Sequence, residues 1–313
     1  MTDLAKQPDT ATSETFADRL LGASIPARDA RLRLVRLDDT LAEILAAHNY
    51  PPAIRHVLAE ALVIAALVGG LIGEGEDAGD DGGAGQMTIQ AQTKAGVVKL
   101  LVCDYRQGAL RGYADFDAEG LAELGANPSL AALFGEGFLA ITFDVPERGG
   151  RYQGIVPLEG DSLAEACERY FQQSEQVPTM VRIAVRAEGT RTLAAGLLAQ
   201  HLPDGEVGRE RLHVRQNFPE WEHVQVMASS IRHEELLEED ISLEALVWRL
   251  FHEEEEVRVF PGAALSRGCR CSVEHYESVL GRFPEAEKAE MHDENGDILV
   301  DCAFCSKVLA IAV

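Results

Sequence analysis

Four cysteines near the C-terminus are the residues of this sequence best suited to chemistry. They form two close pairs, a C-x-C of Cys269 and Cys271 and a C-x-x-C of Cys302 and Cys305, with 30 residues between the pairs. A thiolate is a soft ligand, and four thiolates suit a tetrahedral zinc ion. Each pair can supply two ligands from one tight turn, and the two pairs meet if the spacer between them folds back. The spacing therefore predicts a metal site built from these four cysteines.

The first pair leaves the chemistry open between metal binding and oxidation. A C-x-C spacing is less common in structural zinc sites than C-x-x-C. With one residue between its two sulfurs, it can also close into a small, strained disulfide. Strained, exposed disulfides tend to be labile or regulatory. We therefore interpret the four cysteines as a zinc cage, as a pair of disulfides, or as a switch between the two states.

The N-terminal sequence bears on the compartment in which these cysteines act. Residues 1–16 have no basic segment followed by an apolar one, so no secretory signal peptide is predicted. In a reducing interior, such a cysteine pattern is more often metal-binding or redox-active than permanently oxidised. We therefore expect a cytoplasmic protein that holds one Zn²⁺ in its reduced state.

The composition argues against two classes of partner. The chain of 313 residues has a formal net charge of −24. A chain this acidic repels phosphate backbones and anionic lipid surfaces, so we expect neither nucleic-acid nor membrane binding. Its longest strongly apolar stretch, residues 61–72, has 12 residues. A membrane-spanning helix needs about 20.

The pattern of apolar residues predicts an α+β fold of β-sheets and packed helices. Strand patterns occur at residues 31–37, 87–91, 97–105, 109–116, 138–145, 152–158, 180–187 and 194–202. Strands and helices do not alternate regularly, which favours α+β over a doubly wound sheet. Thr40 with Glu43 and Ser162 with Glu165 match the capping box that begins a helix. A helix from about residue 52 to 68 is apolar nearly all round, which predicts its burial.

Changes in composition predict four segments along the chain. These are a flexible tail (1–14), an α+β core domain (15–203), a charged helical linker (204–260) and a zinc-binding redox-switch module (261–313). In the linker, one helical face behind Ser242, a suitable N-cap, carries Leu243, Leu246, Val247, Leu250 and Phe251. Because the linker has one apolar stripe among many acids, we expect it to fold only while it rests on another surface. The acidic, glycine-rich residues 73–85 are predicted to be a solvated loop.

The sequence contains no convincing enzyme site. It has neither a Walker A lysine nor an H-E-x-x-H pair, so we do not expect an enzyme. Cys103 lies within a strand pattern, and Cys167 lies on the apolar face of the helix that follows Ser162. Both are predicted to be inert core residues.

Taken together, these features resemble the heat shock protein 33 family, the redox-regulated 33 kDa chaperonins. The resemblance covers roughly residues 15–305. Besides the cysteine pattern, it rests on Arg36-Leu37, Ile44-Leu45, Leu110-Arg111-Gly112, Tyr152-Gln153-Gly154, Leu158-Glu159-Gly160, Tyr170-Phe171, Ser174-Glu175-Gln176, Pro178-Thr179 and Arg249-Leu250-Phe251-His252-Glu253-Glu254.

The resemblance implies a holdase, a chaperone that binds unfolding client proteins without ATP. In such a protein the reduced, zinc-bound form is inactive. Oxidation would form the disulfides Cys269–Cys271 and Cys302–Cys305, release zinc, unfold the linker and allow client binding, commonly as a homodimer. The residues leave open an alternative, a constitutive zinc-ribbon interaction module whose metal is purely structural.

Overall fold

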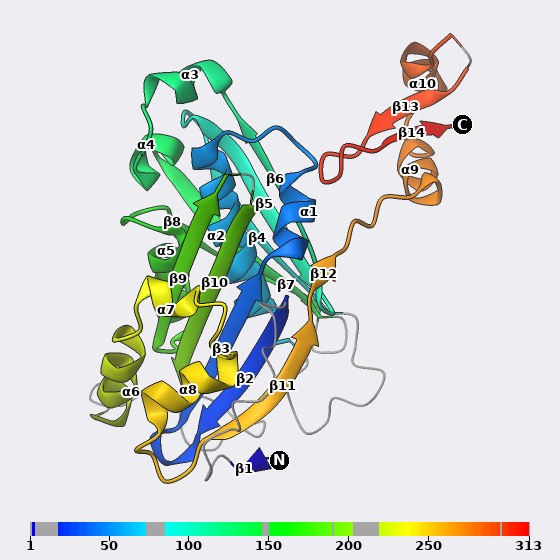
Figure 1. The fold of residues 1–313 in the computed structure, drawn as a ribbon. Helices are drawn as coiled ribbons and strands as arrows, with labels where there is room; N and C mark the ends of the chain where they lie inside the picture. Colours follow the sequence, from blue (N-terminus) through cyan, green and yellow to red (C-terminus); the bar gives the residue numbers. More distant parts are fainter. Residues whose placement is uncertain are drawn as a thin grey trace.

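The structure is a computed structural model that describes residues 2–3 (backbone alone), 18–72, 85–145, 150–189, 191–202, 219–294 and 296–312. The predicted tail and all but the last residue of the predicted loop at 73–85 fall outside these described side chains. The fold is α+β, as predicted. Two sheets enclose a long helix, short helices cover the outer face of one sheet, and a small C-terminal module stands to one side (Figure 1).

Sheet A has the strand order β1-β11-β2-β3-β10-β9, and every neighbouring pair is antiparallel. Its strands are β1 (Thr2–Asp3), β2 (Arg19–Ile25), β3 (Ala30–Leu37), β9 (Thr179–Glu188), β10 (Arg191–His201) and β11 (Arg258–Ala264). A 3₁₀ turn, Pro26–Arg28, joins β2 to β3. The strand predicted at 31–37 is confirmed as β3, which is buried on both faces along most of its length.

Sheet B has the order β12-β6-β5-β4-β7-β8. Its strands are β4 (Gln86–Thr93), β5 (Val98–Arg106), β6 (Ala109–Phe116), β7 (Gly137–Val145), β8 (Gly150–Pro157) and β12 (Ser266–Arg267). Strand β12 pairs in parallel with β6, whereas the other pairs are antiparallel. The strands predicted at 87–91 and 97–105 are confirmed as β4 and β5, which pair as a hairpin, and in its turn the Gly96 N–H donates to Thr93 Oγ1 at 3.0 Å.

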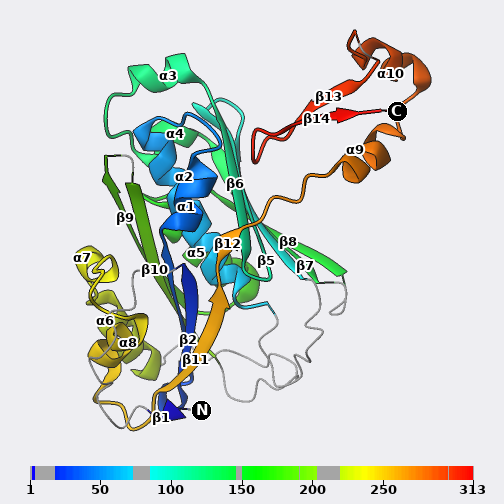
Figure 2. The same ribbon diagram turned by 45° about the vertical axis from the view of Figure 1, so that its right-hand side comes forward.

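Helix α2 (Pro52–Gly69) lies between the two sheets and fills the centre of the core domain (Figure 2). Its length and composition would suit a membrane span, but 78% of its residues are buried within the protein. It is therefore a buried core helix, which explains why it is apolar nearly all round. The shorter helices of this domain are α1 (Asp39–Leu45), α3 (Ala118–Glu123), α4 (Leu130–Phe134) and α5 (Leu163–Tyr170), the last continued by a π-turn, Phe171–Glu175.

The start of α1 differs from the prediction. Thr40 is not its N-cap, because the helix begins at Asp39 and the Asp18 carboxylate accepts from the N–H groups of Asp38 (2.7 Å) and Thr40 (2.9 Å). Each of the two oxygens of this carboxylate accepts one of these bonds, so Asp18 takes the place of the expected Thr40 cap. Ser162 is confirmed as the N-cap of α5, since its Oγ accepts from the Glu165 N–H at 3.2 Å. The Glu165 carboxylate accepts from the Asp161 N–H at 3.1 Å instead of from that of Ser162, so the capping box is not complete.

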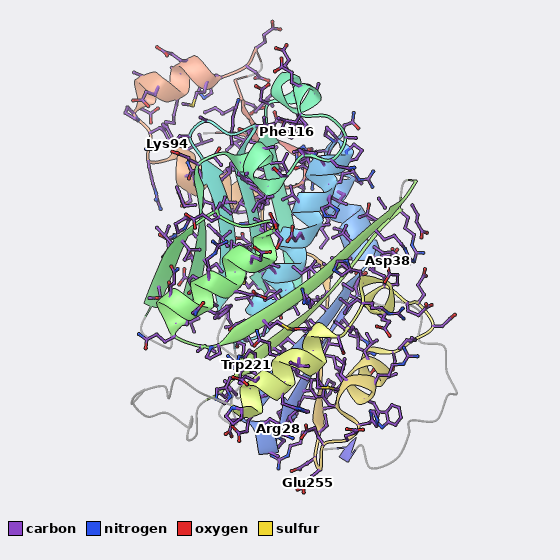
Figure 3. All side chains as sticks on the ribbon, turned by 90° about the vertical axis from the view of Figure 1, so that its left-hand side faces the viewer. Arg28, Asp38, Lys94, Phe116, Trp221 and Glu255 are labelled. Carbon is purple, nitrogen blue, oxygen red and sulfur yellow. The ribbon has the colours of Figure 1, made fainter. Side chains whose placement is uncertain are left out.

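Three helices of the predicted linker cover the face of sheet A that is turned away from α2 (Figure 3). They are α6 (Pro219–Ser229), α7 (His233–Leu236) and α8 (Leu243–Phe251). The predicted apolar stripe of α8 is confirmed, because all five of its residues are buried. Ser242 is its N-cap, with Oγ accepting from the Ala245 N–H at 3.1 Å.

Residues 258–267, which we call the strap, connect the linker to the C-terminal module. The strap runs along β2 in sheet A as β11 and then beside β6 in sheet B as β12 (Figure 1). Leu265, between the two strands, is buried, and its N–H donates to the Asp18 carbonyl at 2.8 Å. The predicted boundary between linker and module at 260/261 falls inside β11.

The C-terminal module is small and has little apolar core. It contains α9 (Val273–Leu280), α10 (Glu285–Met291) and a hairpin of β13 (Ile298–Asp301) and β14 (Val308–Ile311). Among its described residues, the buried apolar cluster is Leu280, Ile298 and Ile311. Asn295 lies outside the described residues, and on either side of it His292 and Ile298 form a single antiparallel bridge. A core this small needs additional cross-links to hold one conformation.

Candidate metal and redox centre

The four predicted cysteines come together in the C-terminal module. Their Sγ atoms all lie within 4.8 Å of one another. Cys269 Sγ lies 3.5 Å from both Cys271 Sγ and Cys302 Sγ, and Cys271 Sγ lies 3.5 Å from Cys305 Sγ. The spacer of α9, α10 and β13 thus folds back as the sequence predicted.

Local backbone structure holds each pair of cysteines. Cys269 and Cys271 lie in the extended segment between β12 and α9. Cys302 directly follows β13 and begins a knuckle in which its carbonyl accepts from the N–H groups of Cys305 (3.2 Å) and Ser306 (2.8 Å). Ser306 adopts a left-handed backbone conformation with φ of 56°, which turns the chain back into β14. This turn directs two sulfurs toward one point.

The electrostatics of the cluster favour a single negative charge when no metal is bound. Burial opposes ionisation of Cys302, but hydrogen bonds from the Cys269 thiol and from the Phe304 and Cys305 N–H groups lower its pKa to about 7. Burial and hydrogen bonds to neighbouring thiols raise the pKa of Cys271. One thiolate thus forms readily, and its charge opposes formation of a second.

The donor set fits a zinc ion. Four Zn–S bonds of about 2.3 Å at tetrahedral angles place the sulfurs about 3.8 Å apart, close to the observed separations. A dication would also offset the repulsion among four thiolates. Tyr276 on α9 lies beside the cluster and hydrogen-bonds Cys302. Burial and this partner raise the pKa of the Tyr276 hydroxyl to about 12. The sequence pattern did not single out Tyr276.

The residues between the cysteines attach the cluster to the core domain, a feature that the sequence did not predict. Arg270, inside the C-x-C, places Nη2 2.8 Å from Asp104 Oδ2 on β5. Arg111 on β6 bonds the same oxygen through Nε (2.7 Å) and Nη2 (2.6 Å), while Thr88 Oγ1 donates to Asp104 Oδ1 at 2.6 Å. The guanidinium carbon of Arg111 also lies 4.0 Å from the ring centroid of Phe304, inside the C-x-x-C. Asp104, only 3% exposed, therefore joins both cysteine motifs to sheet B.

A second contact lies on the other side of the knuckle. His48 Nε2 is 2.7 Å from the Ala303 carbonyl, and Ser306 Oγ donates to the Ala47 carbonyl at 2.6 Å. Tyr113 on β6 meets the Phe304 ring edge-on. A change in the conformation of the knuckle would therefore disturb its contacts with the core domain.

The two remaining cysteines lie outside this cluster, in the core domain. Cys103 on β5 and Cys167 on α5 are both fully buried, and burial raises the pKa of each thiol. A thiol held protonated in an apolar environment reacts slowly. These positions agree with the predicted structural role.

The linker is held on sheet A by a buried arginine that the sequence did not single out. Arg36 on β3, 3% exposed, donates to three backbone carbonyls of the linker, those of Leu236, Glu238 and Ile241, at 2.5–3.2 Å. These carbonyls close the turn between α7 and α8. The linker thus depends on sheet A for its polar as well as its apolar contacts.

Comparison with known proteins first defines the class of fold. The crystal structure of the 33 kDa chaperonin, a heat shock protein 33 homolog, from Thermotoga maritima matches with a TM-score of 0.73. The match covers 94% of each chain at 21% sequence identity. The fold is therefore that of a 33 kDa chaperonin.

Sequence comparison then identifies the family. A family model described as Hsp33 protein matches residues 18–312. The 33 kDa chaperonin of Caulobacter vibrioides is 35% identical over 98% of this chain and 97% of its own. That of Ectopseudomonas mendocina is 36% identical over 89% and 87%, respectively. The chain belongs to the Hsp33 family of chaperonins, which are not enzymes and which act on client proteins.

Proposed function

We propose that this protein is a redox-regulated, ATP-independent holdase whose four clustered cysteines are the switch. In the reduced protein, Cys269, Cys271, Cys302 and Cys305 hold one Zn²⁺ as thiolates, and the protein is inactive. The proposal rests on one observation: four Sγ atoms meet in a module with a very small apolar core. Bound zinc supplies folding free energy, an apparent 10–16 kcal/mol at neutral pH in small zinc-binding peptides.

Oxidation removes the thiolates that hold the module together. Each disulfide forms as two thiols lose two protons and two electrons to an oxidant such as a peroxide. We assign the pairs Cys269–Cys271 and Cys302–Cys305 on the family resemblance, because Cys269 Sγ lies equally close to Cys271 and Cys302. Disulfide sulfurs are poor metal ligands, so the module loses zinc and the folding free energy that zinc supplies.

The strap transmits this change to the linker. Loss of the module's fold breaks the contacts of Arg270 and Phe304 with sheet B and frees the end of the strap beyond β12. Once β11 separates from β2, the linker loses its C-terminal attachment. The linker then unfolds, because ordering it costs about 1–2 kcal/mol per residue in backbone entropy. The apolar face of sheet A that it covered becomes available to clients.

The proposed partners and location follow from this mechanism and from the charge. Unfolding client proteins bind the oxidised form, which associates as a homodimer, while the many acidic residues keep complexes soluble. Neither nucleic acid nor membrane is a partner, and the protein acts in the cytoplasm. The proposed parts remain a tail (1–14), a core domain (15–203), a linker (204–260) and a switch module (261–313).

The experiment exposes the protein to mild peroxide with gentle heating and follows zinc release and suppression of client aggregation. Both should appear together, and the Cys103→Ala, Cys167→Ala double variant is the matched control that should behave like the unmodified protein. A constitutive zinc-ribbon module would show neither effect. Finding no zinc in the reduced protein would refute the ligand assignment.

A further inference from the structure

Four arginines form a row on the face of sheet A that the linker covers. They are Arg19 on β2, Arg36 on β3, Arg191 on β10 and Arg186 on β9, which are four adjacent strands. Arg19 is paired with Arg36 across the β2–β3 ladder, and Arg186 is paired with Leu193, two residues beyond Arg191. Arg36 lies opposite Ala195 on β10, so Arg19 and Arg36 are the two that lie directly opposite each other, and like charges in such positions destabilise a sheet.

The linker supplies the negative groups that offset this charge. Glu244 accepts two hydrogen bonds from Arg19, at 2.9 and 2.7 Å. Glu239 lies between Arg191 and Arg186, with contacts of 3.1–3.4 Å. Arg36 donates to the linker carbonyls described above. Two core carboxylates also reach the row, Asp38 on Arg191 and Glu188 on Arg186.

An apolar surface adjoins the row on the same face. The side chains nearest to it along the four strands include Leu21, Leu34, Ala195, Leu193 and Ala184, all buried under the linker. Here the linker itself alternates apolar and acidic residues, as in Leu236-Leu237-Glu238-Glu239 and Leu243-Glu244. The covered face is therefore complementary to a segment that is both apolar and acidic.

We infer that this face, once the linker has left, selects client segments in which acidic residues flank an apolar run. Acidic residues of the client would take the places of Glu244 and Glu239 on the arginine row, and its apolar side chains would replace those of α8. The inference rests on the proposed detachment of the linker. The arginine row would then be a positively charged surface on a protein whose net charge of −24 repels acidic segments elsewhere.

The test uses the oxidised full-length protein and two fluorescent peptides with the same apolar residues, one flanked by glutamates and the other by lysines. Fluorescence anisotropy should show at least fivefold tighter binding of the acidic peptide. Raising the salt concentration should reduce this preference, because ionic contacts on an opened surface are screened. Equal affinities, or tighter binding of the basic peptide, would overturn the inference, and this comparison needs only the unmodified protein.

A pair of variants locates the effect. Arg19→Gln combined with Arg186→Gln should bring the preference below twofold. Arg258→Gln should preserve the preference, because Arg258 on β11 is paired with Ser24 and so lies on the opposite face of the same sheet. Circular dichroism of the reduced variants checks that they fold, and an unchanged preference in the folded double variant would refute the arginine row as its source.

The same samples separate this inference from the proposed function. If the oxidised protein prevents client aggregation but binds neither peptide, the inference is wrong and the holdase function stands. If it fails to prevent aggregation, the proposed function fails and the inference with it.

Discussion

The contact between Arg270 and Asp104 predicts that the residue between two cysteines controls the attachment of the module. We consider Arg270→Gln, which removes the charge but leaves all four cysteines in place. The Arg270 side chain is 27% exposed and that of Asp104 is 4% exposed, with 2.8 Å between Nη2 and Oδ2. Asp104 retains Arg111 and Thr88 as partners, so the variant does not leave a buried carboxylate unpaired.

The size of the effect follows from these contacts. A hydrogen bond to a charged group contributes about 1.5–3 kcal/mol, and partial exposure of Arg270 reduces this to about 1–2 kcal/mol. A loss of that size changes the ratio of attached to detached module by a factor of about 5–30. Zinc stoichiometry in the reduced protein should not change, because Arg270 is not a ligand.

Hydrogen exchange of the reduced protein measures this ratio. The Ser266 and Gly268 N–H groups donate to the Gly108 and Leu110 carbonyls, at 3.0 and 2.7 Å, so they report on attachment of the strap beside β6. Their exchange should accelerate about 5–30-fold in Arg270→Gln, in proportion to local opening. Zinc release after peroxide should also be faster.

Arg267→Gln is the matched control, because it makes the same change in charge on an exposed side chain three residues away from Arg270. It should leave both rates close to those of the unmodified protein. If Arg270→Gln and Arg267→Gln exchange and release zinc at the same rates, the Arg270–Asp104 contact does not hold the module.

Three further predictions address the linker and the core domain. Arg36→Met should leave three linker carbonyls without their donor and destabilise the packing of the linker on sheet A by about 3–5 kcal/mol. The reduced, zinc-loaded variant should therefore suppress client aggregation measurably, and a fully inactive variant would contradict this. Burial raises the pKa of Glu60 to about 7, so its contribution to stability is greatest below about pH 4.5 and is lost as pH rises through 7. Glu60→Gln should therefore stabilise the reduced protein by on the order of 2–3 kcal/mol at pH 8.5 but much less at pH 5, measured by denaturant unfolding; an equal effect at both pH values would refute it. The Cys103→Ala, Cys167→Ala variant should keep full peroxide activation, and a folded variant that cannot be activated would show that one of these buried thiols takes part.

Much of the fold follows from local sequence patterns. The apolar α2, the alternating strands and the Ser242 cap each leave a signal within a few residues, because helix and strand periodicity and capping are local properties. The meeting of the four cysteines was also predicted, since two close pairs of soft ligands can together supply the four ligands of a zinc site.

The contacts that join these parts were not predicted, because they join residues distant in the sequence. Asp104 and Arg270 are 166 residues apart, and Arg36 lies 200 or more residues from the carbonyls that it holds. The error at Thr40 also arises from a contact outside the local motif. The α1 N-terminus is capped by Asp18, 20–22 residues earlier in the chain, which a four-residue motif cannot reveal. Alternating arginines in β3 indicate a strand but not the element that covers each face.

The strap gives the proposed switch a threshold. Its two strands resist separation unequally, because β12 has two residues paired with β6, whereas β11 pairs with β2 along most of its length. A module that loses its fold therefore frees β12 first, while β11 still anchors the linker. We expect a brief or weak oxidative pulse to stop at this stage and reverse on reduction without exposing sheet A. Sustained oxidation would also separate β11 from β2. Because the two strands separate one after the other, the protein would respond to lasting oxidation but not to a brief pulse.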